Sequence, residues 1–171
     1  MSNIGFEISV IFFLILANGV FAMSEMAVVT ARKSRLQDWA NKGSAKARVA
    51  LELANMPNRF LSSVQIGITL IGILAGAFGG RTLADRLAAY LTVIPVIEPY
   101  SEAVGLGAVV LAITYFSLVI GELVPKRLAL RHPEGIAAAM AIPMRALSRI
   151  SYPVVLLLSI STDAVFGLFG K

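Results

Sequence analysis

The chain has 171 residues, of which 57% are hydrophobic and 15% charged, with a mean hydropathy of +0.81 and a formal net charge of +5. Soluble domains are about 45–50% apolar and about 25% charged, so this composition indicates a membrane protein of a single domain. The absence of cysteine excludes disulfides and thiolate metal sites.

Three apolar stretches are predicted to cross a membrane, over about residues 4–31, 60–80 and 103–122. Each approaches or exceeds the roughly 20 residues that cross about 30 Å of hydrocarbon. The first is read as an uncleaved helix, because no basic residue precedes it and it ends at the basic run that starts at Arg32. Ser101 is predicted to cap the third.

The basic residues predict the orientation of these spans. Seven lie between the first and second spans, two between the second and third, and five follow the third before residue 150. Basic loops face the cytoplasm, so we expect residues 32–59 and 126–149 inside, residues 81–102 outside, the N-terminus outside and Lys171 inside. The expected location is the cell inner (plasma) membrane, as a multi-pass protein. Because the basic residues flank apolar spans, they favour lipid headgroups over nucleic acid as partners.

Two further segments combine apolar and charged residues. Residues 34–56 are predicted to form amphipathic helices on the inner membrane face, broken near Gly43 and closed by Pro57, with a soluble cytoplasmic helix pair as the alternative. Residues 142–170 are largely apolar, but this apolar run is interrupted by Pro143, Arg145, Arg149, Pro153 and Asp163. We interpret them as short helices along the same face, and a fourth crossing is the alternative.

The stretch "GELVPK", Gly121 to Lys126, is the strongest candidate for chemistry. Pro125 has no N–H, so in a continued helix the carbonyl of Gly121 is left free. In a membrane such an oxygen needs water, a side chain or a cation as its partner, and Glu122 places a carboxylate beside it. Hard cations such as Mg²⁺ prefer ligands of this kind. The alternative is that Glu122 pairs with Lys126 and the proline only ends the helix.

The spans also carry polar or small faces. Asn18 and Glu25 lie seven residues apart and share a helix face. In the second span the stripe consists of Ser62, Gln65, Thr69, Gly72 and Gly76, and in the third of Thr114, Ser117 and Gly121. Small and hydroxyl residues are common contacts between membrane helices. The two carboxylates within the spans, Glu25 and Glu122, are functional candidates. Together with the polar faces of the three spans they predict an ion site.

Three motifs in order resemble the transmembrane module of the CNNM/CorC family of magnesium transporters. They are "NGVFAMSEMAVVTARKSRLQ", "NRFLSSVQIGITLIGILAGAFGG" and "GELVPKRLALRHPE". The similarity runs over roughly residues 5–150. Some members of the family carry asparagines where this chain has Ile68 and Gly72, so the ligands on the second span differ from that pattern.

The resemblance implies that residues 1–171 form an all-α membrane domain, a homodimer of three-span subunits with a belt of juxtamembrane helices. It implies export of Mg²⁺ through a dehydrated or partly dehydrated intramembrane cation site, with Na⁺ as the candidate coupling ion. The implied metal-site residues are Ser24, Ser62, Ser63, Gly121 and Glu122, with Asn18 and Gln65 nearby. Family members usually continue into cytoplasmic CBS domains, which are expected in the full-length protein and are absent from this chain.

Other classes of function are weaker. A membrane scaffold or Mg²⁺ sensor that acts through partner proteins is the main alternative, and it has no need for Glu122 in an accessible cavity. A secreted pore-forming toxin conflicts with the "RKSR" run and the inward basic bias. We expect no enzyme activity, since the sequence has no nucleophile–base arrangement or phosphate-binding loop.

Overall fold

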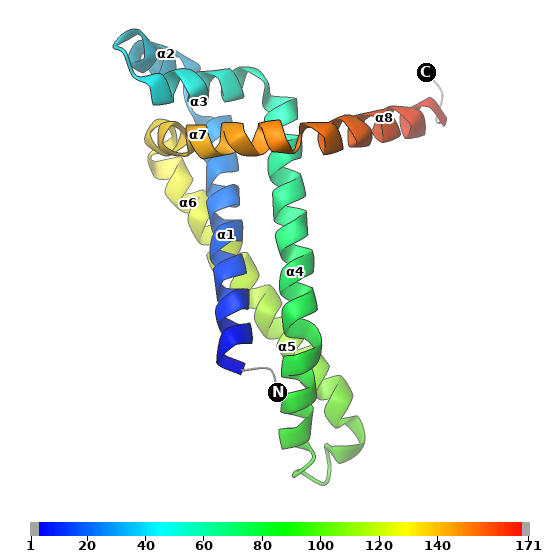
Figure 1. The fold of residues 1–171 in the computed structure, drawn as a ribbon. Coiled ribbons are helices and arrows are strands. Elements are labelled where there is room, and N and C mark those ends of the chain that lie inside the picture. The colour runs from blue at the N-terminus through cyan, green and yellow to red at the C-terminus, as the bar shows by residue number, and fades with distance from the viewer. Residues whose placement is uncertain (1–3, 169–171) are drawn as a thin grey trace. The chain divides into compact units, whose positions relative to one another are not determined.

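The computed structural model describes residues 4–168, which form helices joined by short connections, with no strand among them (Figure 1). The elements are α1 (Ile4–Thr30), α2 (Lys33–Asn41), α3 (Ala45–Asn55), α4 (Pro57–Leu91), η1 (Glu98–Tyr100), α5 (Ser101–Leu118), the π turn η2 (Val119–Leu123), α6 (Val124–Arg131), α7 (Pro133–Ile150) and α8 (Tyr152–Leu168). The predicted all-α class is confirmed.

Three helical stretches are long and apolar enough to cross a membrane, as predicted. They are Ile4–Thr30, Pro57–Leu91 and Glu98–Arg131, with mean hydropathies of 2.1, 1.8 and 2.3. α4 runs past the predicted 60–80 span at both ends. Its C-terminal extension follows from the residues after Gly80, which are mostly alanine and leucine and favour helix even beside charges. The connection after α4 is therefore shorter than the predicted 81–102.

α5 begins at Ser101 itself, and no side chain caps it, so the predicted Ser101 cap is wrong.

The chain divides into two compact units. The described part of the first unit is residues 4–22 and 68–127, and that of the second is residues 23–67 and 128–168.

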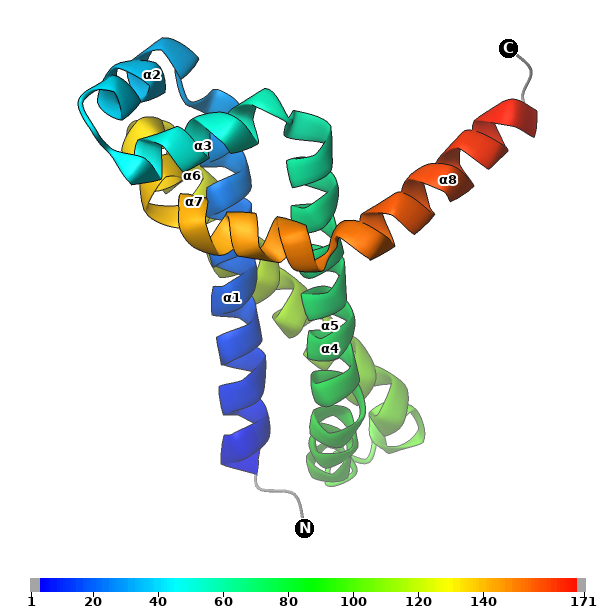
Figure 2. The same cartoon turned by 45° about the horizontal axis from the view of Figure 1, so that its top comes forward.

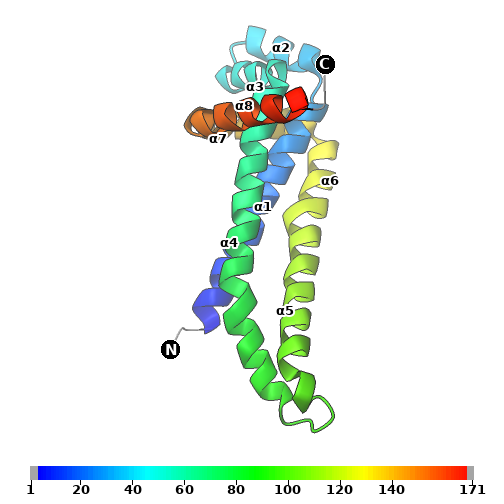
Figure 3. The ribbon, with the colours of Figure 1, turned by 90° about the vertical axis from the view of Figure 1, so that its right-hand side faces the viewer.

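In the first unit, α4 and α5 run side by side and are joined through η1 (Figure 3). Gly105 permits this approach, since a Cβ added there would lie 2.9 Å from the carbonyl oxygen of Ala84 and 2.9 Å from the backbone nitrogen of Ala88. At Gly79 an added Cβ would collide with Ile113 of α5 and lie 2.9 Å from Ile11 of α1. Glycines therefore let the helices of this unit pack at close range.

In the second unit, α3 packs along α7 and against α2 (Figure 2). Its core is small and apolar, with Leu36, Ala47, Ala50, Ala137 and Ala141 fully buried. The break predicted near Gly43 is present, because Gly43 adopts φ +93° and Ser44 caps α3 by accepting a hydrogen bond from the N–H of Ala47. The position of α2 and α3 on a membrane face stays a prediction.

Residues 142–168 of the predicted 142–170 segment belong to α7 and α8, and residues 169–170 lie outside the described part. Pro143 interrupts the apolar run but not the helix, since it lies inside α7. Buried residues on both sides of it, Ala141 and Met144 among them, hold the helix together through packing. The chain bends by 62° between α7 and α8, and by length and composition this pair also fits one broken span. Both placements stay open.

Candidate cation site in the third apolar helix

A π turn interrupts the third apolar helix at the predicted motif. In η2 the N–H that follows the turn, that of Val124, donates to the carbonyl of Val119, five residues back. Pro125 is then the second residue of α6, where a missing N–H is tolerated. π turns occur frequently at functional sites. Pro125 is the residue in the sequence that points to this place in the helix. Its missing N–H predicted a Gly121 carbonyl without a backbone partner, and it did not predict a π turn.

The carbonyl of Gly121 has a partner. The side-chain Nδ2 of Asn18 on α1 donates a hydrogen bond to it at 3.0 Å. A Cβ at position 121 would lie 3.2 Å from that nitrogen and 3.2 Å from the carbonyl oxygen of Ile15, so glycine is needed for the approach. The sequence predicted that this carbonyl lacks a backbone N–H and needs another partner, and the Asn18 side chain is that partner. A carbonyl oxygen has a second lone pair that can accept a further partner.

Asn18 also presents an unsatisfied acceptor. Its Oδ1 atom is buried and has no hydrogen-bond partner among the described residues. Buried polar atoms without a protein partner are uncommon, and many of them bind a water molecule or an ion. Asn18 was predicted to lie near the site, and it is the residue that joins α1 to η2.

Glu122 and Lys126 form the ion pair considered as the alternative. Lys126 Nζ lies 2.7 Å from Glu122 Oε1, and the two side chains are 28% and 41% exposed. An i,i+4 pair of this exposure contributes only about 0.3–0.5 kcal/mol. The pair uses one carboxylate oxygen, so Glu122 retains a second for another ligand.

Gly19 is a residue of this region that the sequence motifs did not single out. A Cβ there would lie 3.0 Å from Pro125 Cγ and 3.1 Å from the carbonyl oxygen of Ile120. The signal in the sequence is its place next to Asn18, the partner of Gly121. Asn18 and Gly19 together fit α1 against the π turn.

The first unit thus contains Asn18, Gly121 and Glu122, and the other candidate ligands belong to the second unit. There, Ser24 and Ser63 are fully buried, Ser62 is half-buried and Gln65 is exposed. The Ser63 hydroxyl donates to the carbonyl of Arg59 at 2.9 Å and lies 3.3 Å from the hydroxyl of Ser148. The role of these four residues as ligands stays a prediction.

Over the described residues, no three His, Cys, Asp or Glu side chains gather into a metal-binding group. A cation bound near Glu122 would therefore have at most two such side chains from the described residues, together with neutral oxygens. Such a donor set suits hard cations that keep part of their water shell.

The helices and this motif define a multi-span α-helical membrane protein. The family model described as the cyclin M transmembrane N-terminal domain (CNNM) matches residues 9–171, and the chain belongs to this family. The resemblance drawn from the three motifs is thereby confirmed.

Curated relatives match nearly the whole chain. It is 53% identical to UPF0053 protein sll0260 of Synechocystis over 99% of this chain and 38% of that protein. It is 28% identical to UPF0053 protein YugS of Bacillus subtilis, over 96% of this chain and 38% of that protein. A protein of Haemophilus influenzae named polyamine export protein is 28% identical over 91% of this chain and 36% of that protein. The chain thus spans less than two-fifths of these relatives.

Proposed function

We propose that the chain is the membrane domain of a divalent-cation transporter that exports Mg²⁺, with Na⁺ as the coupling ion. The observation that carries the proposal is the Oδ1 of Asn18, which is buried and has no partner among residues 4–168, on a side chain that also bonds the carbonyl of Gly121. Glu122, the residue after Gly121, carries a carboxylate. Membership of the CNNM family supports the same class of function.

The energetics of Glu122 favour a cation partner. A charged carboxylate at the centre of a membrane helix costs about 2.5–3.5 kcal/mol on insertion scales, and less near an interface. The ion pair with Lys126 offsets only a small part of that cost. A divalent cation that displaces Lys126 would offset more of it, because it carries twice the charge and binds oxygen directly.

The proposed coordination is partly dehydrated. Mg²⁺ takes six oxygens at about 2.0–2.1 Å and gives up water reluctantly. Glu122, the second lone pair of the Gly121 carbonyl and the Asn18 Oδ1 supply ligands from the first unit. Hydroxyls of Ser24, Ser62 or Ser63 are proposed to add to them in the transporting state, and water completes the shell.

Flux through reconstituted protein tests the proposal. We expect Mg²⁺ efflux from proteoliposomes that depends on a Na⁺ gradient, and loss of that flux in Glu122→Gln, which keeps the shape and removes the charge. Lys126→Met is the matched control and should retain Mg²⁺ binding. If Glu122→Gln transports like the parent and Lys126→Met unfolds, the motif is only a salt-bridged helix end.

Two other functions give different results in the same assay. The name of the Haemophilus influenzae relative favours polyamine export as a second candidate. In that case spermidine moves through the protein and Mg²⁺ does not. A sensor would bind Mg²⁺, seen as a raised unfolding temperature, without any flux, and a scaffold would show no flux and no dependence on Glu122.

A further inference from the structure

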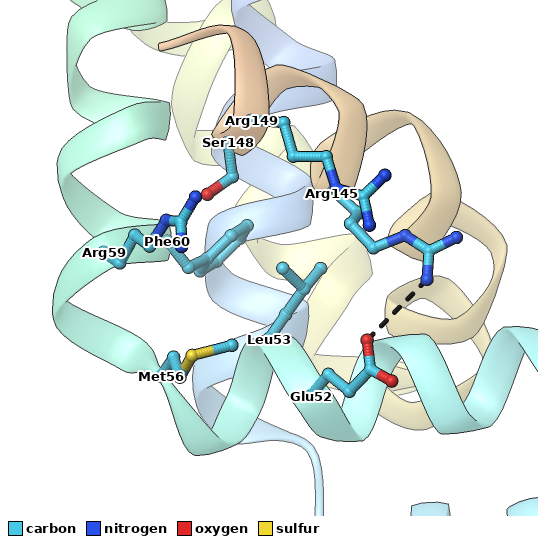
Figure 4. A pocket seen from close by; sticks show the side chains of 8 residues that line it. All are labelled: Glu52, Leu53, Met56, Arg59, Phe60, Arg145, Ser148 and Arg149. Atoms are coloured by element: carbon cyan, nitrogen blue, oxygen red, sulfur yellow. Dashed lines mark ion pairs between the residues drawn. The ribbon is translucent and has the colours of Figure 1, made fainter. Parts of the chain in front are cut away.

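A small pocket in the second unit is lined by an unusual number of arginines. It has a volume of about 170 Å³ and lies where the end of α3, the start of α4 and α7 meet (Figure 4). Arg59 of α4 stands on one side, Arg145 and Arg149 of α7 stand on the other, and Phe60 lies between them. All of its walls belong to the second unit.

The charge of this pocket is not balanced. Glu52 is its one carboxylate, and it pairs with Arg145 at 3.7 Å. Among the residues that the structure describes, Arg59 and Arg149 have no ion pair, and the buried Nε of Arg59 has no acceptor. Arg145 and Arg149 are also i,i+4 neighbours on α7, an arrangement in which like charges are unfavourable. An anion in the pocket would relieve all three conditions.

Arg59 is held in place from its other side. Its guanidinium carbon lies 4.4 Å from the centre of the Tyr152 ring, within the range of a cation–π contact. The hydroxyl of Ser63 donates a hydrogen bond to the backbone carbonyl of Arg59 and also contacts the hydroxyl of Ser148, which lines the pocket. A fixed guanidinium loses little side-chain entropy on binding a ligand.

A groove adjoins this arginine-lined pocket at Arg59, which lines both. It has a volume of about 270 Å³, with apolar lining from Tyr152, Val155 and Leu156, and Asn58, Ser62 and Ser159 also line it. α8 continues the apolar surface, with Leu157, Ile160 and Phe166 between 59% and 70% exposed. Arg59 therefore stands at a boundary between a cationic pocket and an apolar surface, which is the arrangement that an amphiphilic ligand requires.

We propose that the arginine pocket binds a phosphate group, and that the headgroup of an anionic phospholipid supplies it. Guanidinium groups match the geometry of phosphate oxygens and form charge-assisted hydrogen bonds with them. The acyl chains of the lipid would follow the groove beside Tyr152 and Leu156. A bound lipid would fasten the junction of α3, α4 and α7 to one membrane leaflet. This inference is independent of which cation, if any, the protein transports.

Lipid-dependent stability of the purified chain in detergent tests the proposal. The unfolding temperature is measured against added phosphatidylglycerol, against phosphatidylcholine, and against inorganic phosphate. We expect phosphatidylglycerol to raise it saturably and phosphatidylcholine to have a much smaller effect. Arg149→Gln, at an exposed residue without an ion pair in the described part of the chain, should weaken the apparent affinity for phosphatidylglycerol by about tenfold, as expected for loss of one charge-assisted contact.

Two further variants separate the pocket from general surface charge. Arg59→Lys keeps the charge and loses the planar fork, and it should also weaken phosphatidylglycerol binding. Arg131→Gln removes an exposed arginine of the same unit that does not line the pocket, and it should leave the affinity unchanged within about twofold. An equal loss in Arg131→Gln would overturn the proposal, and so would equal binding of both lipids. If inorganic phosphate alone saturates the effect, the site binds phosphate and the proposed lipid source is wrong.

Discussion

The Asn18 side-chain amide donates a hydrogen bond to the carbonyl oxygen of Gly121, at 3.0 Å, and so joins α1 to the π turn across 103 residues of sequence. The same side chain buries an oxygen that has no partner among the described residues. One residue thus both fixes the geometry of the turn and offers a ligand beside it.

Two measurements on one Asn18 variant test these two roles. Asn18→Leu keeps the branched shape and removes the donor and the acceptor. Interhelical hydrogen bonds in membranes contribute about 0.6–2 kcal/mol, so we expect a modest loss of stability without metal. We expect Mg²⁺-dependent thermal stabilisation to disappear, because a proposed ligand is gone. Thermal unfolding in detergent with and without Mg²⁺ measures both effects, and full retention of the metal effect would remove Asn18 from the ligand set.

The pair Gly105 and Gly107 on α5 tests the close packing of the first unit. A Cβ at Gly105 meets backbone atoms of Ala84 and Ala88 at 2.9 Å, and one at Gly107 meets nothing within 4 Å. Gly105→Ala should therefore cost about 1–3 kcal/mol through overpacking. Gly107→Ala should be neutral or stabilising by up to about 1 kcal/mol, since alanine favours helix. Equal unfolding temperatures for the two variants would contradict this packing.

Glu134 is expected to stabilise the second unit. This carboxylate is 5% exposed, accepts a hydrogen bond from the N–H of Arg32 at 3.4 Å and lies 3.5 Å from Arg35. It also sits in the first turn of α7, where a negative charge is favourable. Glu134→Gln should cost about 1–3 kcal/mol. The control is Glu52→Gln, whose side chain is 49% exposed, and it should cost less than about 1 kcal/mol when unfolding is measured without lipid.

Accessibility of single cysteines tests the predicted orientation. The native chain has none, so each introduced thiol is unique. An impermeant reagent added outside intact cells should label a cysteine at Glu98, which precedes α5, and should not label one at Asp38 in α2. A cysteine at Asp163 in α8 distinguishes the two placements of the α7–α8 pair. It stays unlabelled if the pair lies along the inner face, and external labelling would mean that the pair crosses as a fourth span.

The small-residue face of α4 and α5 is expected to form the homodimer contact. Gly72 and Gly76 have open space at their Cβ positions, and they line a concavity of about 310 Å³ with Thr114 and Ser117. Such faces allow close backbone approach between membrane helices. Gly76→Leu should weaken self-association, measured by light scattering in detergent. An unchanged dimer would assign this face to another role, such as lining the ion pathway.

Local features of the sequence determined much of the fold. The three apolar stretches specify long helices, because a membrane requires every backbone N–H and C=O to be bonded within its own helix. The turn at Gly43 followed from the one residue type that adopts φ +93° readily. Helix ends were less predictable. α4 continues through charged residues to Leu91, because alanine and leucine favour helix there. α7 continues through Pro143, because packing outweighs the local preference.

The candidate sites depended on tertiary structure to a greater degree. The sequence pointed to Glu122 and Gly121 through the missing N–H of Pro125, a local property. It could not show that Asn18 bonds that carbonyl, because the partners are 103 residues apart. The same reason applies to the arginine pocket, where Arg59 meets Arg145 and Arg149 only because α4 and α7 pack together. Hydropathy and spacing describe one segment at a time, whereas a binding site is a set of distances between segments, and only packing determines those.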